Sequence, residues 1–291
     1  MSINNMGEGV TRALLHAFNL HPKKRLGQNF LIDEVVLARI IDAADISNND
    51  EVLEIGTGLG VLTQALAKKA KHVVTLDPDK DMIQIAKQVL AGFDNIDFIA
   101  ADFLKWQPKK RVAEVVSTSA GFNKVVANVP YYITSPIIEK LLTEPRSPSI
   151  PRISGSRDLF AGSACPSIVL TVQKEVAERL AASPGSRAFG SFTVFVQNRA
   201  EVKIDSFISK KSFYPSPDVD SAILVLKPYG KLLYNIDEKI VRAAFSQRRK
   251  MIRSSLSKFN IDFSLIGIDP RRRPETLSLE EFEKISLKDI R

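Results

Sequence analysis

Short apolar runs alternate with segments of helical spacing through the middle of the chain. Five runs predict strands, at residues 51–56, 72–77, 96–101, 124–129 and 167–173. Helices are predicted between or after them, at residues 60–70, 79–91, 135–143 and 174–182. Near-continuous apolar strands that alternate with helices are typical of a parallel sheet with helices on both faces. The pattern therefore predicts an α/β fold built on such a sheet.

The pattern changes on either side of this region. Residues 1–22 predict an N-terminal tail with a short amphipathic helix at 10–18. A helix with Asp33 as its N-cap follows and extends to residue 44. Two later apolar runs, at 190–197 and 221–227, have no helix of comparable length between them. We expect these two runs to form an antiparallel hairpin at the sheet edge.

The last 61 residues have helical periodicity, with 14 Lys and Arg against 9 Asp and Glu. Residues 236–258 predict one long helix, and Ser278 and Glu281 have the spacing of a capping box that opens a final helix. We expect a main domain over residues 23–230, with a loop insert rich in proline, glycine and serine at 144–166. A small helical C-terminal domain would then cover residues 231–291.

The composition excludes several classes of protein. Of 291 residues, 44% are hydrophobic and 25% charged, as in ordinary globular proteins. One cysteine and three histidines without ligand spacing predict neither a disulfide framework nor a metal site. No apolar run reaches the roughly 18–20 residues that span a bilayer, and the polar start lacks a secretory h-region. We expect no membrane association and a cytoplasmic location, because a start with Glu8 and little arginine is unlike a transit peptide.

The charge balance favours a partner that carries phosphates. The net charge is +8, and neutralising phosphates releases counterions. Three basic groups are candidate contacts: Lys23, Lys24 and Arg25; Arg248, Arg249, Lys250 and Arg253; and Arg271, Arg272 and Arg273. On one helix Arg249 and Arg253 would share a face, which Arg242 would extend. Any one group could be a solvated surface, but together they predict contacts to nucleic-acid phosphates.

A glycine-rich segment, residues 54–60 (EIGTGLG), joins the first predicted strand to its helix. Glycines at such a turn let the backbone approach a nucleotide-type ligand at a helix N-terminus. The spacing of Gly56, Gly58 and Gly60 is G-x-G-x-G, which differs from the G-x-G-x-x-G of dinucleotide dehydrogenases. A nicotinamide cofactor is therefore disfavoured.

Two aspartates end the next two strands. Asp77 can accept both hydroxyls of a ribose, and Asp102 can accept a hydrogen bond from an adenine amino group. Either residue alone would suit a helix N-cap. The carboxyl ends of parallel strands, however, meet at one edge of the sheet, where such sheets bind ligands. The set predicts S-adenosylmethionine, which carries an adenosine but no phosphates.

Residues 128–131 (NVPY) end the fourth predicted strand. The exocyclic amine of adenine is a poor nucleophile, because its lone pair is delocalised into the ring. The Asn128 side-chain oxygen and the Val129 carbonyl can accept hydrogen bonds from the two hydrogens of this amine. These bonds would favour the pyramidal, nucleophilic form of the amine. Pro130 stiffens the turn, and Tyr131 offers a stacking face for a flipped-out base. These residue types predict methyl transfer by in-line displacement, without a general base.

Several motifs make the sequence resemble the ribosomal RNA adenine dimethyltransferases of the KsgA type, which are relatives of the Erm resistance methyltransferases. The resemblance covers about residues 20–291. Its motifs are KRLGQNFL at 24–31, the glycine segment, AD at 101–102, NVPYYIT at 128–134, QKEVA at 173–177, FYPSPDVDS at 213–221 and FSQRRK at 245–250.

The resemblance implies a Rossmann-like, seven-stranded methyltransferase domain with a small all-helical domain that binds RNA. It implies that a monomer dimethylates two adjacent adenosines in a 3′-terminal hairpin of small-subunit (16S) rRNA, within a pre-30S particle, during ribosome biogenesis. The family's cofactor contacts carry over to Gln28, Asn29, Leu31, Gly56, Gly58, Asp77, Asp102 and Asn128. Its target-base residues carry over to Asn128, Pro130 and Tyr131, and Phe213 matches an aromatic residue that stacks on the base.

Two positions depart from the family pattern. Asp77 stands where glutamate is usual, with Asp79 matching an acid two residues later, and Thr57 replaces a common proline. Two alternatives stay open: an Erm-like 23S rRNA methyltransferase, and a non-catalytic ribosome assembly or nucleic-acid-binding factor. The FSQRRK segment and the long N-terminus favour the small-subunit enzyme over the Erm type. The intact NVPY motif favours an enzyme over a non-catalytic factor.

Overall fold

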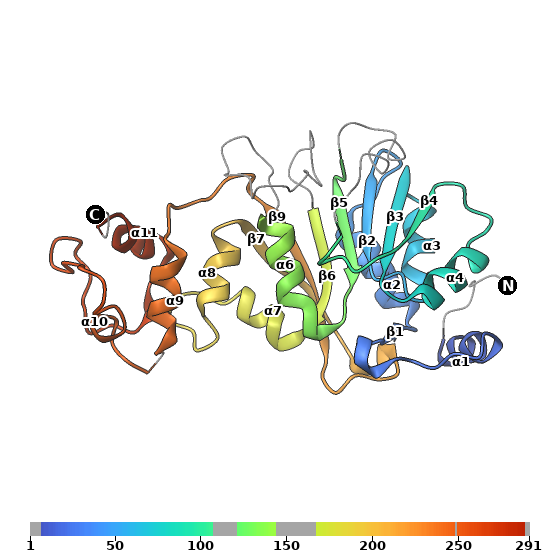
Figure 1. Ribbon diagram of the computed structural model, residues 1–291, viewed down its shortest axis with the longest axis horizontal. Helices are drawn as coiled ribbons and strands as arrows, with labels where there is room; N and C mark the ends of the chain where they lie inside the picture. The colour runs from blue at the N-terminus through green and yellow to red at the C-terminus, as the bar shows by residue number, and fades with distance from the viewer. Residues whose placement is uncertain (1–6, 107–120, 144–166, 248, 289–291) are drawn as a thin grey trace.

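The computed structural model describes residues 7–106, 121–143, 167–247 and 249–288, and its largest element is a seven-stranded sheet (Figure 1). Five strands run parallel where the apolar runs predict them: β2 (Glu51–Ile55), β3 (His72–Asp77), β4 (Ile96–Ala100), β5 (Lys124–Asn128) and β6 (Ser167–Gln173). The antiparallel strands β9 (Ser221–Pro228) and β7 (Ala200–Ile208) complete one edge. The order β4-β3-β2-β5-β6-β9-β7 confirms the predicted Rossmann-like α/β fold.

Helices cover both faces of the sheet, because successive residues of a strand point to opposite sides. Val125 of β5 packs in a core formed with α6 (Thr134–Thr143) and α7 (Lys174–Leu180). Its neighbour Val126 packs in a second core formed with α2 (Glu34–Ala44) and α3 (Val61–Ala67). Burial on both faces explains why the central strands have almost continuous apolar sequences.

The N-terminal segment packs against the main sheet's helices. Leu14 and Leu15 of α1 (Glu8–Ala17) form a small core with Met82 and Ile85 of α4 (Lys80–Val89). The short strand β1 (Phe30–Leu31) pairs with β8 (Phe213–Tyr214), far along the chain. The predicted N-cap of α2 is confirmed, since the Asp33 carboxylate accepts hydrogen bonds from two backbone N–H groups of its first turn.

The predicted partner of β9 is wrong. Residues 190–197 are not a strand, because they include the helix α8 (Ser191–Gln197). At the start of this helix, Thr193 Oγ1 accepts a hydrogen bond from the Gly190 N–H at 3.2 Å. The strand beside β9 is β7, in which exposed residues such as Glu201 and Lys203 alternate with less exposed ones. Charges on an edge strand are a common protection against pairing with other chains, and they interrupt the apolar run.

Four helical segments follow the sheet: α9 (Glu238–Ser246), α10 (Ile252–Ser255), η4 (Pro274–Thr276) and α11 (Leu279–Lys288). The single long helix predicted over 236–258 is wrong, because the chain leaves helical geometry at Gln247. Beyond the break, the Ile252 N–H donates to the carbonyl of Arg272 and the Arg253 N–H to that of Pro270. These tertiary hydrogen bonds replace the intrahelical ones that a continuous helix would make.

The start of α11 is as predicted. The Glu281 N–H donates to Ser278 Oγ at 3.1 Å, and the Ser278 N–H donates to Glu281 Oε2 at 2.8 Å, which completes the capping box. Phe245 and Phe282 lie at the centre of a third core, with ring centroids 5.9 Å apart. Phe189, from the segment before α8, also packs on Phe245, so this core joins the C-terminal helices to the sheet domain.

Three short 3₁₀ turns complete the described elements: η1 (Lys24–Leu26), η2 (Tyr131–Ile133) and η3 (Lys210–Ser212). The predicted insert at residues 144–166 lies outside the described residues. Among the helices that the structure describes, none is both long and apolar enough to span a bilayer.

Candidate active site

The glycine segment forms a tight turn between β2 and α3. Gly56, Gly58 and Gly60 have φ angles of 93°, 52° and 83°, in the left-handed region that favours glycine. A Cβ added to Gly56 would lie 3.3 Å from the Asn128 carbonyl oxygen, so a side chain would crowd this approach. Glycine at this position therefore brings the turn against the end of β5, where the predicted catalytic residues begin.

Asp77, at the end of β3, fixes the conformation of this turn. Its Oδ2 accepts a hydrogen bond from the Gly58 N–H at 3.0 Å, and its Oδ1 accepts one from the Asp79 N–H at 2.8 Å. The side chain is buried, and burial raises the pKa of Asp77. Each carboxylate oxygen can still accept a second hydrogen bond, so a role in holding the turn is compatible with a contact to a ribose.

A buried polar pair and a buried acid lie on the sheet side of the same turn. The hydroxyls of Thr57 and Thr75 are 2.6 Å apart. Thr63 donates to Glu54 Oε2 at 2.6 Å, and burial raises the pKa of Glu54 to about 8. Sequence reasoning assigned no role to Glu54, because nothing in the sequence shows that this strand residue is fully buried.

Residues 23–31, which we call the N-terminal strap, are tied to the segment after β3. Lys23 Nζ lies 2.8 Å from Asp79 Oδ1 and 2.7 Å from Asp81 Oδ2. Gln28 Nε2 donates to Asp79 Oδ2 at 2.8 Å, and Gln28 Oε1 accepts from the Lys23 N–H at 2.8 Å. The amine of Lys23, predicted to contact RNA, is therefore committed to two carboxylates of its own chain.

The strap also contacts residues 128–131, which we call the catalytic turn because the sequence predicts that they act on the substrate. A Cβ added to Gly27, whose φ is 60°, would lie 3.0 Å from Cβ of Pro130. Asn128 Nδ2 donates to the carbonyl oxygen of Asn29 at 3.3 Å. Because the amide nitrogen has this partner, the side-chain oxygen of Asn128 is the atom left for a substrate. The Tyr131 hydroxyl lies 2.5 Å from Ser221 Oγ, which restrains the aromatic ring.

One narrow pocket of about 80 Å³ brings most of the predicted residues together. Its lining includes eight of them: Gln28, Asn29, Leu31, Gly56, Gly58, Asn128, Pro130 and Tyr131. The donors and acceptors fit an adenosine with an amino-acid tail. The volume is below the roughly 300–1,000 Å³ of typical ligand pockets, and the strap forms one wall.

Three predicted residues do not line this pocket: Asp77, which holds the glycine turn from behind, Asp102 and Phe213. Asp102 Oδ1 accepts from the Leu104 N–H at 3.0 Å, so the carboxylate caps the local turn. Phe213 is only 3% exposed and packs in the core with α2 and α3, so its ring offers no open stacking face in this conformation. Tyr132, next to the catalytic turn, is 62% exposed. Sequence reasoning gave Tyr132 no role, because its exposure depends on how η2 lies against the strap.

The predicted RNA-contact residues fall into two groups. Lys24, Arg25, Arg249, Lys250 and Arg253 are exposed, whereas Arg248 lies outside the described residues. Arg249 precedes α10 and Arg253 lies within it, so the predicted shared helical face is wrong. Arg271 and Arg272 are paired with Asp269 and Glu281.

Among the described residues, no group of three or more His, Cys, Asp and Glu side chains is arranged to bind a metal ion.

Comparisons with known proteins show that this chain is similar to ribosomal RNA methyltransferases. The model of a family described as ribosomal RNA adenine dimethylase matches residues 19–286. A ribosomal RNA small subunit methyltransferase A from Moorella thermoacetica is 39% identical over 293 residues, covering 96% of each chain. A crystal structure of a dimethyladenosine transferase from Plasmodium falciparum has a TM-score of 0.71 at 29% identity, over 89% of this chain and 96% of the other. That of the 23S rRNA methyltransferase ErmE has a TM-score of 0.65 at 25% identity, over 89% and 99%.

Proposed function

Since the chain belongs to the ribosomal RNA adenine dimethylase family, we propose that it converts two adjacent adenosines of small-subunit rRNA to N6,N6-dimethyladenosine. The target would be a hairpin near the 3′ end of that RNA, reached within a pre-30S particle in the cytoplasm. The observation that carries the proposal is the hydrogen bond from Asn128 Nδ2 to the Asn29 carbonyl, because it leaves the amide oxygen for an adenine amine.

Residues of the turn and the strap would hold the cofactor. S-adenosylmethionine supplies an electrophilic methyl group on a sulfonium. Asp77 would accept from the ribose, Asp102 from the adenine amine, and Gln28, Asn29 and Leu31 would close over the ligand, with Gly56 and Gly58 beneath it. Asp102 would need a ligand that reaches beyond the pocket lining, because its carboxylate lies outside it.

The catalytic turn would activate and orient the target base. Asn128 Oδ1 and the Val129 carbonyl would accept hydrogen bonds from the two hydrogens of N6. These bonds would favour a pyramidal nitrogen whose lone pair is directed at the methyl group. Tyr131, restrained through Ser221, would stack on the extruded base, and Pro130 would keep the turn rigid. Held in this way, the N6 nitrogen would take the methyl group that S-adenosylmethionine would supply from its sulfonium, and the proton displaced from the nitrogen would pass to water.

Exposed basic residues on both sides of the sheet domain would bind the phosphates of the RNA backbone. Lys24 and Arg25 extend from the strap, and Arg249, Lys250 and Arg253 extend from the helical segment 231–291, which we propose as an RNA-binding domain. RNA hairpins are recognised largely by their shape and by phosphate contacts, which suits such scattered charges. A monomer presents both groups to one RNA.

The test is methyl transfer from labelled S-adenosylmethionine to undermethylated small subunits, with free large-subunit rRNA alongside. Digestion and mass spectrometry should find dimethyladenosine in the small subunit. Asn128→Ala should slow the reaction by about 100- to 1,000-fold, the usual effect of losing one aligned polar group. Asn48→Ala is the matched control, because Asn48 is exposed and does not line the pocket.

The other outcomes would each redirect the assignment. Label in large-subunit rRNA alone would favour the activity named for ErmE, whose fold this chain shares. Tight binding to small subunits without any transfer would favour a non-catalytic assembly factor.

A further inference from the structure

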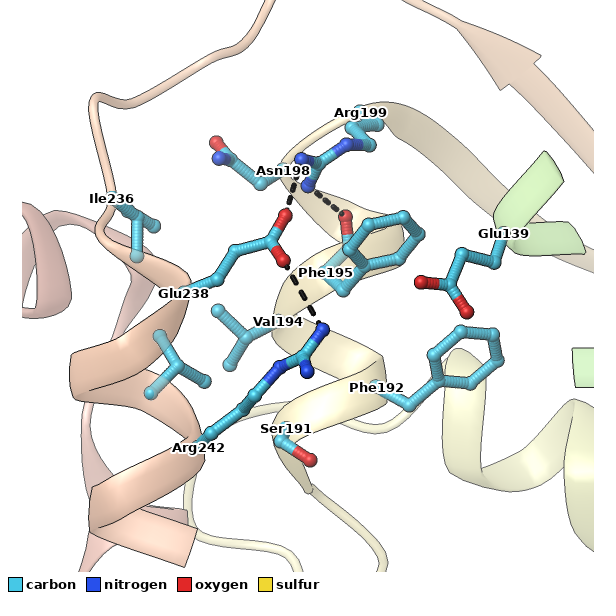
Figure 2. A pocket seen from close by; sticks show the side chains of 11 residues that line it. Glu139, Ser191, Phe192, Val194, Phe195, Asn198, Arg199, Ile236, Glu238 and Arg242 are labelled. Carbon is cyan, nitrogen blue, oxygen red and sulfur yellow. Dashed lines mark hydrogen bonds and ion pairs between the residues drawn. The ribbon is translucent and has the colours of Figure 1, made fainter. Parts of the chain in front are cut away.

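A second pocket, of about 220 Å³, lies where α6, α8 and α9 meet (Figure 2). It is larger than the pocket at the glycine turn, and it is separate from it, because the two share no lining residue. Six of its side chains carry the argument below: Glu139, Phe192, Phe195, Arg199, Glu238 and Arg242.

The aromatic residues form a stack that is covered at one end. Phe192 and Phe195 of α8 are parallel within 8°, with centroids 5.7 Å apart. The guanidinium of Arg199 lies over Phe195, 3.9 Å from its centroid, and is fixed by the Phe195 carbonyl at 3.1 Å and by Glu238 at 2.7 Å. Both rings stay only partly buried, so the pocket exposes ring surface against which a further flat group can stack.

Polar groups face the pocket from opposite sides. Figure 2 shows Glu139 reaching in from α6 and Arg242 from α9. In the part of the chain that is described, the Glu139 carboxylate makes no hydrogen bond or ion pair. Arg242 is 72% exposed and makes one contact, at 3.5 Å, with Glu238. A ligand between them therefore finds an acceptor on one side and donors on the other.

We propose that this pocket binds one unpaired nucleobase of the substrate RNA, beyond the base that is methylated. The base would stack on Phe192, donate from an exocyclic amine to Glu139 and accept from Arg242. The inference rests on the proposed RNA substrate. Unpaired bases of RNA are commonly recognised by stacking on aromatic rings and by hydrogen bonds to their edges.

The size and position of the pocket agree with a single base. Its volume of about 220 Å³ is sufficient for one ring system. Helix α6 starts at Thr134, directly after the catalytic turn, and Glu139 lies about 8 Å further along its axis. Glu139 therefore lies within two helical turns of the residues proposed to hold the target base.

The charges of the pocket favour a neutral guest over a basic side chain of a protein. Its two carboxylates, Glu139 and Glu238, are balanced by Arg199 and Arg242. Glu238 already contacts both arginines, and the charge of Glu139 also acts on Arg199, so neither carboxylate has much attraction left for a further cation. A lysine or arginine entering the pocket would also approach the exposed guanidinium of Arg242.

The experiment measures binding of the full-length protein to a naked hairpin RNA with the two target adenosines, and to copies with an abasic nucleotide at each unpaired position in turn. Phe192→Ala should weaken binding to the intact hairpin by about 5- to 150-fold, the range for losing one stacked base. On one abasic RNA, the same substitution should cause almost no further loss. Phe207→Ala is the control, because Phe207 is 51% exposed on β7, away from the pocket, and its loss should leave binding unchanged.

A second variant tests the pocket without disturbing the aromatic stack. Glu139→Gln changes an exposed side chain and should preserve folding, but it should reduce the preference for bases with an exocyclic amine at the position that the abasic scan identifies. Thermal unfolding of every variant separates lost binding from lost folding.

Two results would overturn the inference. One is a folded Phe192→Ala protein that binds every RNA within twofold of wild type, or whose loss is the same on all abasic RNAs. The other is a loss confined to intact ribosomal subunits, which would assign the pocket to a ribosomal protein. Methyl transfer by the wild-type protein, measured in parallel, distinguishes these results from failure of the proposed function.

Discussion

Replacing Lys23 by methionine removes the amine that ties the N-terminal strap to the segment after β3. The substitution keeps most of the aliphatic stem but deletes both ion pairs, at 2.8 Å to Asp79 and 2.7 Å to Asp81. Gln28 and Asn29, which line the proposed cofactor pocket, lie on the same strap. We therefore expect Lys23→Met to weaken binding of S-adenosylmethionine.

The burial of the two partners sets the size of the effect. The Asp79 side chain is 4% exposed and that of Lys23 is 29% exposed, so the pair lies between an exposed and a buried ion pair. Exposed pairs contribute about 0–1 kcal/mol, whereas removing one partner of a buried pair costs about 3–5 kcal/mol. Asp79 retains a hydrogen bond from Gln28, which lowers the cost to about 1–2 kcal/mol. That range corresponds to a rise in Kd of about 5- to 30-fold.

The assay is calorimetric titration of the RNA-free protein with S-adenosylmethionine. Lys24→Met is the matched control, because Lys24 is exposed and its amine has no partner among the described residues. Burial alone would raise the pKa of Asp79, but the hydrogen bonds from Lys23 and Gln28 outweigh it and lower that pKa. The hydrogen bonds from Lys23 to Asp79 and Asp81 raise the pKa of Lys23 above its ordinary 10.5. The stability from Asp79 is lost only on acidification below its ordinary pKa of 3.8, and that from Lys23 only above 10.5. Between these values the ion pair itself should add no pH dependence to the Kd, so the difference between wild type and Lys23→Met should stay constant.

The reasoning would be refuted if Lys23→Met bound the cofactor as tightly as Lys24→Met and lost more affinity for RNA than that control did. In that case Lys23 would act on RNA phosphates, as its sequence context predicts, and its ion pairs would be incidental.

Three further substitutions test other parts of the structure. Phe213→Ala should lower the free energy of unfolding by about 3–5 kcal/mol in a thermal melt, because the ring lies in the core; lost methyl transfer at unchanged Tm would instead indicate base stacking. The raised pKa of Glu54 means that its contribution to stability is fully present below its ordinary pKa of 4.5 and is lost as the pH rises through about 8. The wild-type Tm should therefore fall across that interval, and Glu54→Gln should flatten the dependence of Tm on pH. Ser278→Ala should cost about 0.5–2 kcal/mol of stability through the lost N-cap while methyl transfer continues, and a drop in transfer without a drop in Tm would contradict this.

The sequence predicted the central strands to within one residue at each end, because strands buried on both faces have a continuous apolar signal. The prediction failed at the antiparallel edge. The β-branched and aromatic residues of α8 are typical of strands, yet Phe192 and Phe195 lie one helical turn apart and share a face. The true edge strand, β7, carries charged side chains at Glu201, Lys203 and Asp205, so it lacked the apolar run that identified the other strands.

The break after α9 depends on contacts that local sequence does not encode. Helical periodicity continues past Gln247, but the backbone of Ile252 and Arg253 finds partners near Arg272 and Pro270, in a loop that follows. Since tertiary hydrogen bonds override local propensity there, the predicted alignment of Arg249 with Arg253 was lost with the helix.

For the site, the strand-end rule brought together the glycine turn, Asp77 and Asn128, because parallel strands end at one edge of the sheet. The same rule could not assign Lys23, which precedes the sheet and forms an ion pair with Asp79 after β3. It also could not show that Phe213 turns its ring into the core. Such outcomes depend on long-range packing, and a basic run beside a motif has the same sequence whether it contacts RNA or its own chain.

The strap links the two halves of the proposed reaction. Lys23 ties the start of the strap to Asp79, and Gly27 lies close to Pro130. Further along the strap, the Asn29 carbonyl accepts a hydrogen bond from Asn128. A displaced strap would release the Asn128 amide, whose nitrogen could then compete with its oxygen for the adenine amine. Lys23→Met should therefore slow methyl transfer even when S-adenosylmethionine is saturating. If saturation restored the full rate, the strap would serve cofactor binding alone, and Asn128 would be oriented by the strand end without it.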